Sequence, residues 1–137
     1  RRLAVGALAA VATRGDAGVL EDVFARVADA DEDVRRAAAE ALAKVAAVGD
    51  GRAAGALGEL LEDEDPDVRC SVASALVAIT RPGEESVLAK LCKVLLDPEE
   101  RVRDAAVLGI VALEGGQVTM STLHSLLSHG ETGARCA

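Results

Sequence analysis

Apolar residues recur along the chain at the spacing of amphipathic helices, in two alternating patterns that we call A and B. In the A segment 84–96, Leu88, Leu91 and Leu95 are three and four residues apart, which places them on one face of a helix. In the B segment 33–48, a stripe of alanine and leucine begins at Val34 and ends at Val45. We therefore predict A helices over 17–29, 51–62, 84–96 and 119–129, and B helices over 1–14, 33–48, 66–81 and 99–114.

The whole pattern repeats every 34 residues. The sequence RRLAVGALAAVATRGD (1–16) aligns with RRAAAEALAKVAAVGD (35–50), and Leu42 is followed at the same interval by Leu76 and Ile110. Stacked two-helix units bury a continuous core, and each unit contacts only its neighbours. This predicts an all-α fold, a right-handed α-α superhelix (alpha solenoid) of about four repeats. Its expected units are 1–16 (partial), 17–50, 51–83, 84–117 and 118–137 (partial).

The two ends of the pattern bear on the domain organisation. The chain opens on a single B helix and stops as another begins, and neither end carries the polar capping repeat that solenoids normally need for solubility. We therefore expect residues 1–137 to form a single array that is part of a longer solenoid. Neighbouring repeats of the parent chain would then be its first partners.

Glycine and aspartate mark the predicted joins between repeats. Gly15, Gly49 and Gly83 follow B helices, at the place where a left-handed residue ends a helix. Asp16 and Asp50 come next, at the position of an N-cap for the following A helix.

The sequence DEDPDVR (63–69) lies between an A and a B helix, and its spaced acidic residues are those of a calcium loop. Such a loop needs glycine at its sixth position for a sharp turn, and that position is Val68. A turn explains the residues better, because Asp65 can cap the B helix and Pro66 suits its first position. We therefore predict a turn and no metal.

The sequence LLEDEDPDVRCSVASAL resembles a HEAT repeat, most closely the short variety of phycobilisome-lyase-like proteins, and LLDPEERVRDAAVLGI and VADADEDVRRAAAEAL follow it. In HEAT families the turn aspartate and the arginine six residues later form a ladder along the stack, which aligns repeats and carries no chemistry. The resemblance implies the pairs Asp29 with Arg35, Asp63 with Arg69, and Asp97 with Arg103. The last unit departs from the pattern, because its loop near EGGQ is two residues shorter and His129 stands in place of the aspartate, which puts the final rung in doubt.

Charge and composition restrict the partners. The net charge of −8 argues against nucleic acid and against an anionic membrane surface, and a basic protein partner fits better. No apolar run is long enough to span a bilayer. The three cysteines, Cys70, Cys92 and Cys136, are far apart and form no CxxC pair, so we expect free thiols in an intracellular, reducing compartment.

No motif for catalysis or for a cofactor is present. His124 and His129 are five residues apart, about 140° round a helix, so they do not share a face that could hold a metal. No HExxH, P-loop or GxSxG sequence occurs. We predict that the protein is not an enzyme and uses no cofactor.

Two surfaces could bind a partner. B helices usually line the concave side of HEAT arrays, and Val77, Leu108 and Val111 fall on the B face opposite the core stripe, where they could form an exposed apolar cluster. The alternative is that they pack against adjacent B helices or against missing repeats of the longer array. The complete predicted set is Ser74, Val77, Arg81, Asp104, Leu108 and Val111. The second surface is an acidic ridge along the A–B turns, which could steer a basic partner or consist only of ordinary helix-start acids.

These observations support a non-catalytic scaffold that binds a partner protein through its concave B face. Two alternatives remain open. One is an accessory or chromophore-handling protein, by analogy with the bilin lyases that have HEAT repeats. The other is a structural spacer inside a larger polypeptide.

Overall fold

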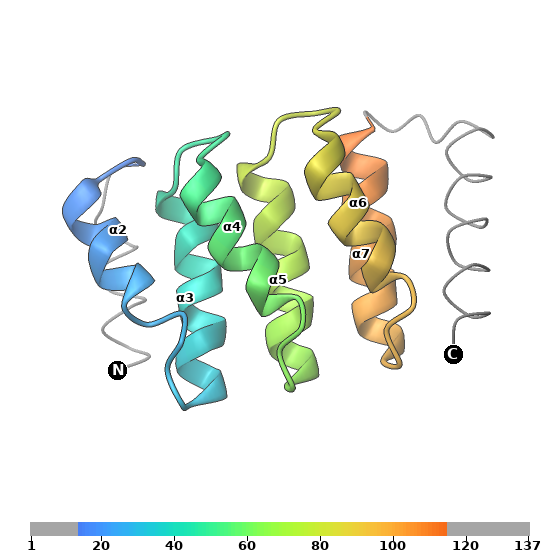
Figure 1. Cartoon of the computed structure of the whole chain (residues 1–137), viewed down its shortest axis with the longest axis horizontal. Helices are drawn as coiled ribbons and strands as arrows, with labels where there is room; N and C mark the ends of the chain where they lie inside the picture. The colour runs from blue at the N-terminus through green and yellow to red at the C-terminus, as the bar shows by residue number, and fades with distance from the viewer. Residues whose placement is uncertain (1–13, 115–137) are drawn as a thin grey trace.

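The computed structural model describes residues 14–114. This part of the chain is made of α-helices joined by short turns and loops (Figure 1). The A helices are α2 (Ala17–Phe24), α4 (Gly51–Leu60) and α6 (Glu85–Val94), and the B helices are α3 (Glu32–Val45), α5 (Pro66–Ile79) and α7 (Glu100–Leu113). The all-α prediction is confirmed, and the predicted helices over 1–14 and 119–129 lie outside the described residues.

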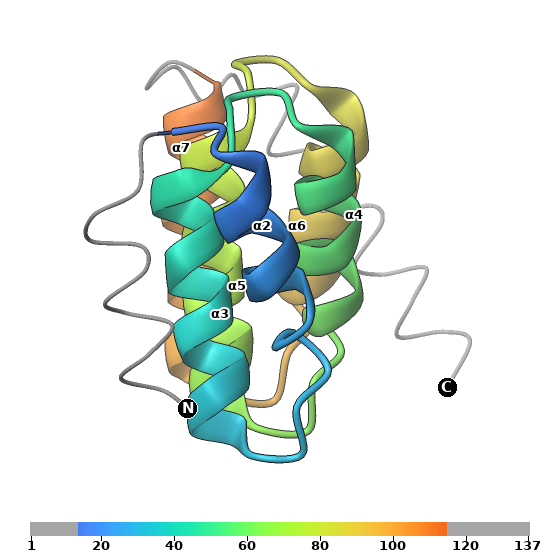
Figure 2. The same cartoon turned by 90° about the vertical axis from the view of Figure 1, so that its left-hand side faces the viewer.

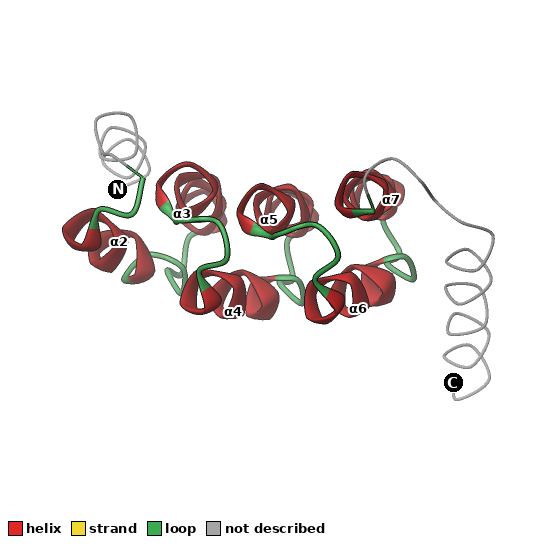
Figure 3. Ribbon diagram, turned by 90° about the horizontal axis from the view of Figure 1, so that it is seen from above, coloured by secondary structure: helices red, strands yellow, loops and turns green. Residues whose placement is uncertain are grey.

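The helices form two layers, with the A helices in one and the B helices in the other (Figure 2). Viewed along the helices, the two layers are parallel rows that curve gently, and the B row lies on the inner side (Figure 3). Successive B helices contact each other along much of their length, whereas α4 and α6 barely touch. The B helices are therefore the closely packed inner face of a solenoid.

The helix starts follow from the residues that precede them. Asp50 and Asp65 cap α4 and α5 with carboxylates that accept hydrogen bonds from backbone N–H groups of the first turn, and Pro66 occupies the first turn of α5 as predicted. Glu84 and Glu99 precede α6 and α7 without a side-chain cap, since the longer glutamate side chain is a poorer N-cap. Each A helix also ends before its predicted limit. The chain then passes through a short turn.

The core lies between the two layers. Leu57 and Leu91 from the A layer and Leu42, Leu76 and Ile79 from the B layer are the largest side chains with almost no exposed surface. Several of the other buried positions of the B helices are alanine, which lets these helices approach closely. The core is thus continuous from repeat to repeat.

The loops from B to A helices join neighbouring repeats through their glycines. Gly15, Gly49 and Gly83 have φ values of 88°, 86° and 79°, as the sequence predicted. The N–H of Gly49 donates to the carbonyl of Ile79, 2.7 Å away at the end of the next B helix, and the N–H of Gly83 donates likewise to Leu113. Left-handed backbone at these glycines therefore satisfies a free carbonyl of the neighbouring repeat.

Candidate partner-binding surface

The inner face holds a groove between α5 and α7. Its volume is about 460 Å³, and it is open to solvent. One side of it comes from α5 and the other from α7, so two adjacent repeats build it together. The lining residues are Cys70, Ser74, Val77, Arg101, Asp104, Ala105, Leu108 and Gly109.

Leu108 is the most exposed large apolar residue of this face. It is 71% exposed and belongs to the lining of the groove. The residues 34 and 68 positions earlier are Ser74 and Glu40, which are also exposed. This helix position therefore faces solvent in every described repeat, and only α7 places a large apolar side chain there.

The floor of the groove is narrow where α7 approaches α5. Gly109 has no side chain, and a Cβ atom at this position would lie 2.7 Å from Cγ2 of Val77 and 3.3 Å from Cδ1 of Leu91. Val77 is half-buried for this reason and packs against the core. At the equivalent contact between α3 and α5, both residues are alanine (Ala43 and Ala75).

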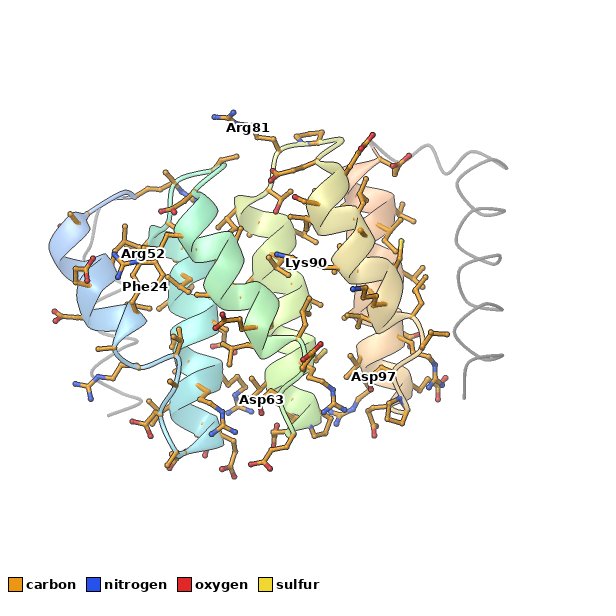
Figure 4. The ribbon with its side chains drawn as sticks, in the orientation of Figure 1. Phe24, Arg52, Asp63, Arg81, Lys90 and Asp97 are labelled. Atoms are coloured by element: carbon orange, nitrogen blue, oxygen red, sulfur yellow. The ribbon has the colours of Figure 1, made fainter. Side chains whose placement is uncertain are left out.

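The structure brings four of the six predicted partner-binding residues into one groove, and these are Ser74, Val77, Asp104 and Leu108. The other two do not line it. Arg81 follows the end of α5, at the edge of the molecule opposite Asp63, and its guanidinium lies against Gly49 in the loop before α4 (Figure 4). Val111 lies close to a turn beyond Leu108 on α7 and is half-buried. The expected cluster of three exposed apolar residues is therefore wrong in part: Val77 and Val111 are half-buried, Val77 because α7 approaches it closely at Gly109, and only Leu108 of the three is exposed.

A second groove between α3 and α5 has a different lining. It has a volume of about 430 Å³ and exposes the opposite charges of Glu40 and Lys44 above alanine and serine. Cys70 and Ser74 belong to both grooves. Sequence reasoning missed this groove, although Glu40 is at the same repeat position as Leu108.

The turn ladder runs along the edge where A helices pass into B helices. Arg35 donates two hydrogen bonds to the carboxylate of Asp63 in the next repeat, at 2.7 and 3.1 Å, and one to the carbonyl oxygen of Asp29 in its own turn. Arg69 repeats this geometry with the Asp97 carboxylate and the Asp63 carbonyl. The predicted pairing within one turn therefore uses only the carbonyl, and the ion pair joins adjacent repeats.

Arg103 donates to the Asp97 carbonyl at 2.7 Å, as the same pattern requires. The doubtful last rung at His129 lies outside the described residues. Asp63 and Asp97 stand at the edge of the molecule that holds the A–B turns (Figure 4).

Burial and hydrogen bonding act in opposite directions on these aspartates. Burial raises the pKa of Asp63, but the hydrogen bonds from Arg35 and from the N–H of Asp65 outweigh it, so its pKa lies below the ordinary value. The same balance with Arg69 lowers the pKa of Asp97. Both carboxylates are therefore ionised at neutral pH and hold the repeats in register.

The same contacts account for the acidic sequence DEDPDVR. Asp63 faces Arg35, Asp65 accepts hydrogen bonds from the N–H groups of the first turn, and Asp67 pairs with Arg101 at 3.1 Å. These three carboxylates are directed toward three different partners and do not converge on one point. The turn interpretation is the one that the structure supports.

Within residues 14–114, no group of three or more histidine, cysteine, aspartate or glutamate side chains is placed to hold a metal ion. No helix in that range combines the length and hydropathy needed to cross a bilayer. Cys70 and Cys92 are free thiols, and burial raises the pKa of Cys92. His124, His129 and Cys136 lie outside the described residues.

Repeated two-helix units, a continuous core and an arginine–aspartate ladder define an α-solenoid. Residues 21–111 match HEAT repeats, and the chain belongs to this family. HEAT repeats commonly mediate protein–protein interactions and are generally non-catalytic. No curated protein matches the chain.

Proposed function

We propose that this protein is a non-catalytic scaffold that binds a partner protein through the inner face of α3, α5 and α7. The observation that carries the proposal is Leu108, a large apolar side chain 71% exposed beside an open groove. Apolar surface of this kind, with a polar rim, is typical of protein-binding sites.

Leu108 does not belong to the buried core of the described repeats. The buried core, the glycine loops and the arginine–aspartate ladder hold the repeats together from other positions. An acidic side chain at position 108 should therefore remove binding and leave the fold intact. Val77 is unsuitable for such a change, because it packs against the core.

The experiment compares the full chain with the double variant Ser74→Asp, Leu108→Asp as bait in extract from the source cells. We expect one protein to be captured by the parent chain and lost by the double variant. A matched control is Leu96→Asp, since Leu96 is 57% exposed but follows α6, away from the groove. Circular dichroism and thermal unfolding check that all three chains are folded.

Retention of the captured protein by the double variant, or its equal loss in the Leu96→Asp control, would contradict the proposal. The captured protein is then purified and its binding to the parent chain measured by calorimetry. Direct binding is expected, since the proposed surface requires no third component.

A further inference from the structure

We propose that the groove between α5 and α7 binds a short peptide segment in which a large apolar residue is adjacent to lysine or arginine. The apolar side chain would lie against Leu108 and Val77, and the cation would lie at Asp104. This inference rests on the proposed function and extends it, because it names the chemistry of the partner's segment.

The lining of the groove indicates that the ligand carries a large apolar side chain. Ala105 lines the α7 side of the groove with a small side chain, and Val77 of α5 and Leu108 of α7 supply apolar surface on its two sides. The exposed side chain of Leu108 would lose contact with water on binding, which is favourable in proportion to the apolar area covered. A large apolar side chain therefore fits this space better than a polar one.

The charges at the rim of the groove indicate that the ligand carries a cation. Among residues 14–114, Arg101 is the one positive group that lines the groove, and it pairs with Asp67 at 3.1 Å and with Glu99 at 3.7 Å. Asp104 is exposed and has no ionic partner among residues 14–114. It precedes Leu108 by one helical turn, so the two side chains are neighbours on α7. A ligand that contacts Leu108 can thus place a cation at Asp104.

The distribution of charge over the whole chain favours the same ligand. We define the acidic edge as the segments 29–36, 62–69 and 97–104, which contain the A–B turns and the first turns of the B helices. These segments hold 13 acidic and 5 basic residues, and the rest of the chain holds ten of each. The net charge of −8 is therefore located at this edge. Asp104 and Arg101 lie at its inner margin, so the field of the edge would attract a basic segment to this end of the groove.

The neighbouring groove between α3 and α5 does not offer the same combination. Its opposite charges, Glu40 and Lys44, are both exposed, and its lining has no large apolar side chain. It therefore provides a matched control site on the same face of the molecule.

The test begins with selection of random twelve-residue peptides displayed on phage against the full chain, after depletion on the Leu108→Asp variant. We expect the enriched peptides to contain leucine, isoleucine or phenylalanine within two residues of lysine or arginine. A labelled synthetic peptide with the consensus sequence is then titrated by fluorescence anisotropy. Asp104→Lys should weaken its binding about tenfold, and Glu40→Lys should change it less than about twofold, because only the first charge lies in the groove.

The possible failures distinguish this inference from the proposed function. Enriched peptides without a basic residue, or binding unaffected by Asp104→Lys, would overturn the inference while the Leu108 surface stands. Failure to enrich any peptide over the depleted background would also overturn it, and the capture experiment with whole protein would then decide the proposed function alone. Equal binding of the consensus peptide to the parent chain and to the Leu108→Asp variant would contradict both this inference and the proposed function.

Discussion

At the scale of single residues, the ladder arginines each serve two repeats. Arg35 and Arg69 hold the carbonyl of their own turn and the carboxylate of the next turn, and their side chains are only 11% and 13% exposed. A bidentate pair with this little exposure has exchanged most of its hydration for protein contacts. Loss of one member therefore costs much more than loss of an ordinary surface ion pair.

The change Asp63→Asn tests this point. It should lower the free energy of unfolding at pH 7 by roughly 3 kcal/mol, because Arg35 would stay buried without its counter-charge. Since folding lowers the pKa of Asp63, its contribution is complete above the unfolded pKa of about 3.9 and is lost as the pH falls through the folded pKa. The difference between variant and parent should thus be constant from pH 7 to about 5 and shrink below about 4. Urea unfolding followed by circular dichroism measures it.

The control for this prediction is Asp22→Asn, at an exposed position of α2. It should change stability by less than about 0.5 kcal/mol at any pH. A difference between Asp63→Asn and the parent that stays constant down to pH 3 would mean that the Asp63 carboxylate contributes nothing through its charge.

At the scale of helices, glycine has different roles on the two layers. Gly109 on α7 leaves room for Val77, whereas a Cβ atom at Gly55 on α4 would meet nothing within 4 Å. On the outer layer, long side chains join the A helices instead. Arg52 of α4 pairs with Glu21 of α2 and lies 4.1 Å from the centre of the Phe24 ring (Figure 4). The close approach at Gly109 is thus a feature of the contact between the B helices α5 and α7.

We predict opposite effects for alanine at these two glycines. Gly109→Ala should destabilise the protein by roughly 1–3 kcal/mol through crowding of Val77 and Leu91. Gly55→Ala should stabilise it by about 0.5–1 kcal/mol, because alanine is the better helix former and the space is open. Thermal and urea unfolding measure both changes.

A double change separates crowding from other effects at this contact. Gly109→Ala combined with Val77→Ala should cost less than the two single changes added together, since the smaller side chain makes room for the new Cβ atom. Additive costs would show that the two residues do not press on each other.

At the scale of the whole molecule, two ladders connect each repeat to the next at opposite edges. Arginine–aspartate pairs run along the A–B turns, and glycine N–H groups bond to the carbonyls that end the neighbouring B helices. Contacts of this kind reach only adjacent repeats, so stability should be a sum of local terms. Loss of one arginine–aspartate pair should therefore destabilise only the repeats that this pair joins.

Hydrogen exchange tests how far such damage extends. Asp97→Asn breaks the rung between α5 and α7, and it should speed amide exchange in α6 and α7 by about tenfold or more while α3 changes little. Asp63→Asn is the matched variant, because it removes the ion pair between the repeats of α3 and α5 instead. Equal acceleration in every helix for both variants would show that the described repeats unfold as one unit.

The predictable part of this structure depends on local or periodic features. The 34-residue spacing, the glycines with positive φ and the aspartate caps at positions 16, 50 and 65 were evident in the sequence. Each depends on a few consecutive residues or on a repeated apolar face, so the chain near each residue is sufficient to predict it. The HEAT-repeat assignment follows from the same features.

The tertiary structure decided which groups meet across repeats. The family resemblance predicted Asp29 as the partner of Arg35, but the offset between stacked turns assigns the ion pair to the Asp63 carboxylate and leaves Arg35 only the carbonyl of Asp29. Val77 and Leu108 are alike in hydropathy, yet the approach of α7 at Gly109 leaves the first half-buried and the second exposed. Periodicity determines the face on which a side chain lies, but its burial and its ionic partner depend on the distance to the neighbouring helix, which is a property of the packed stack.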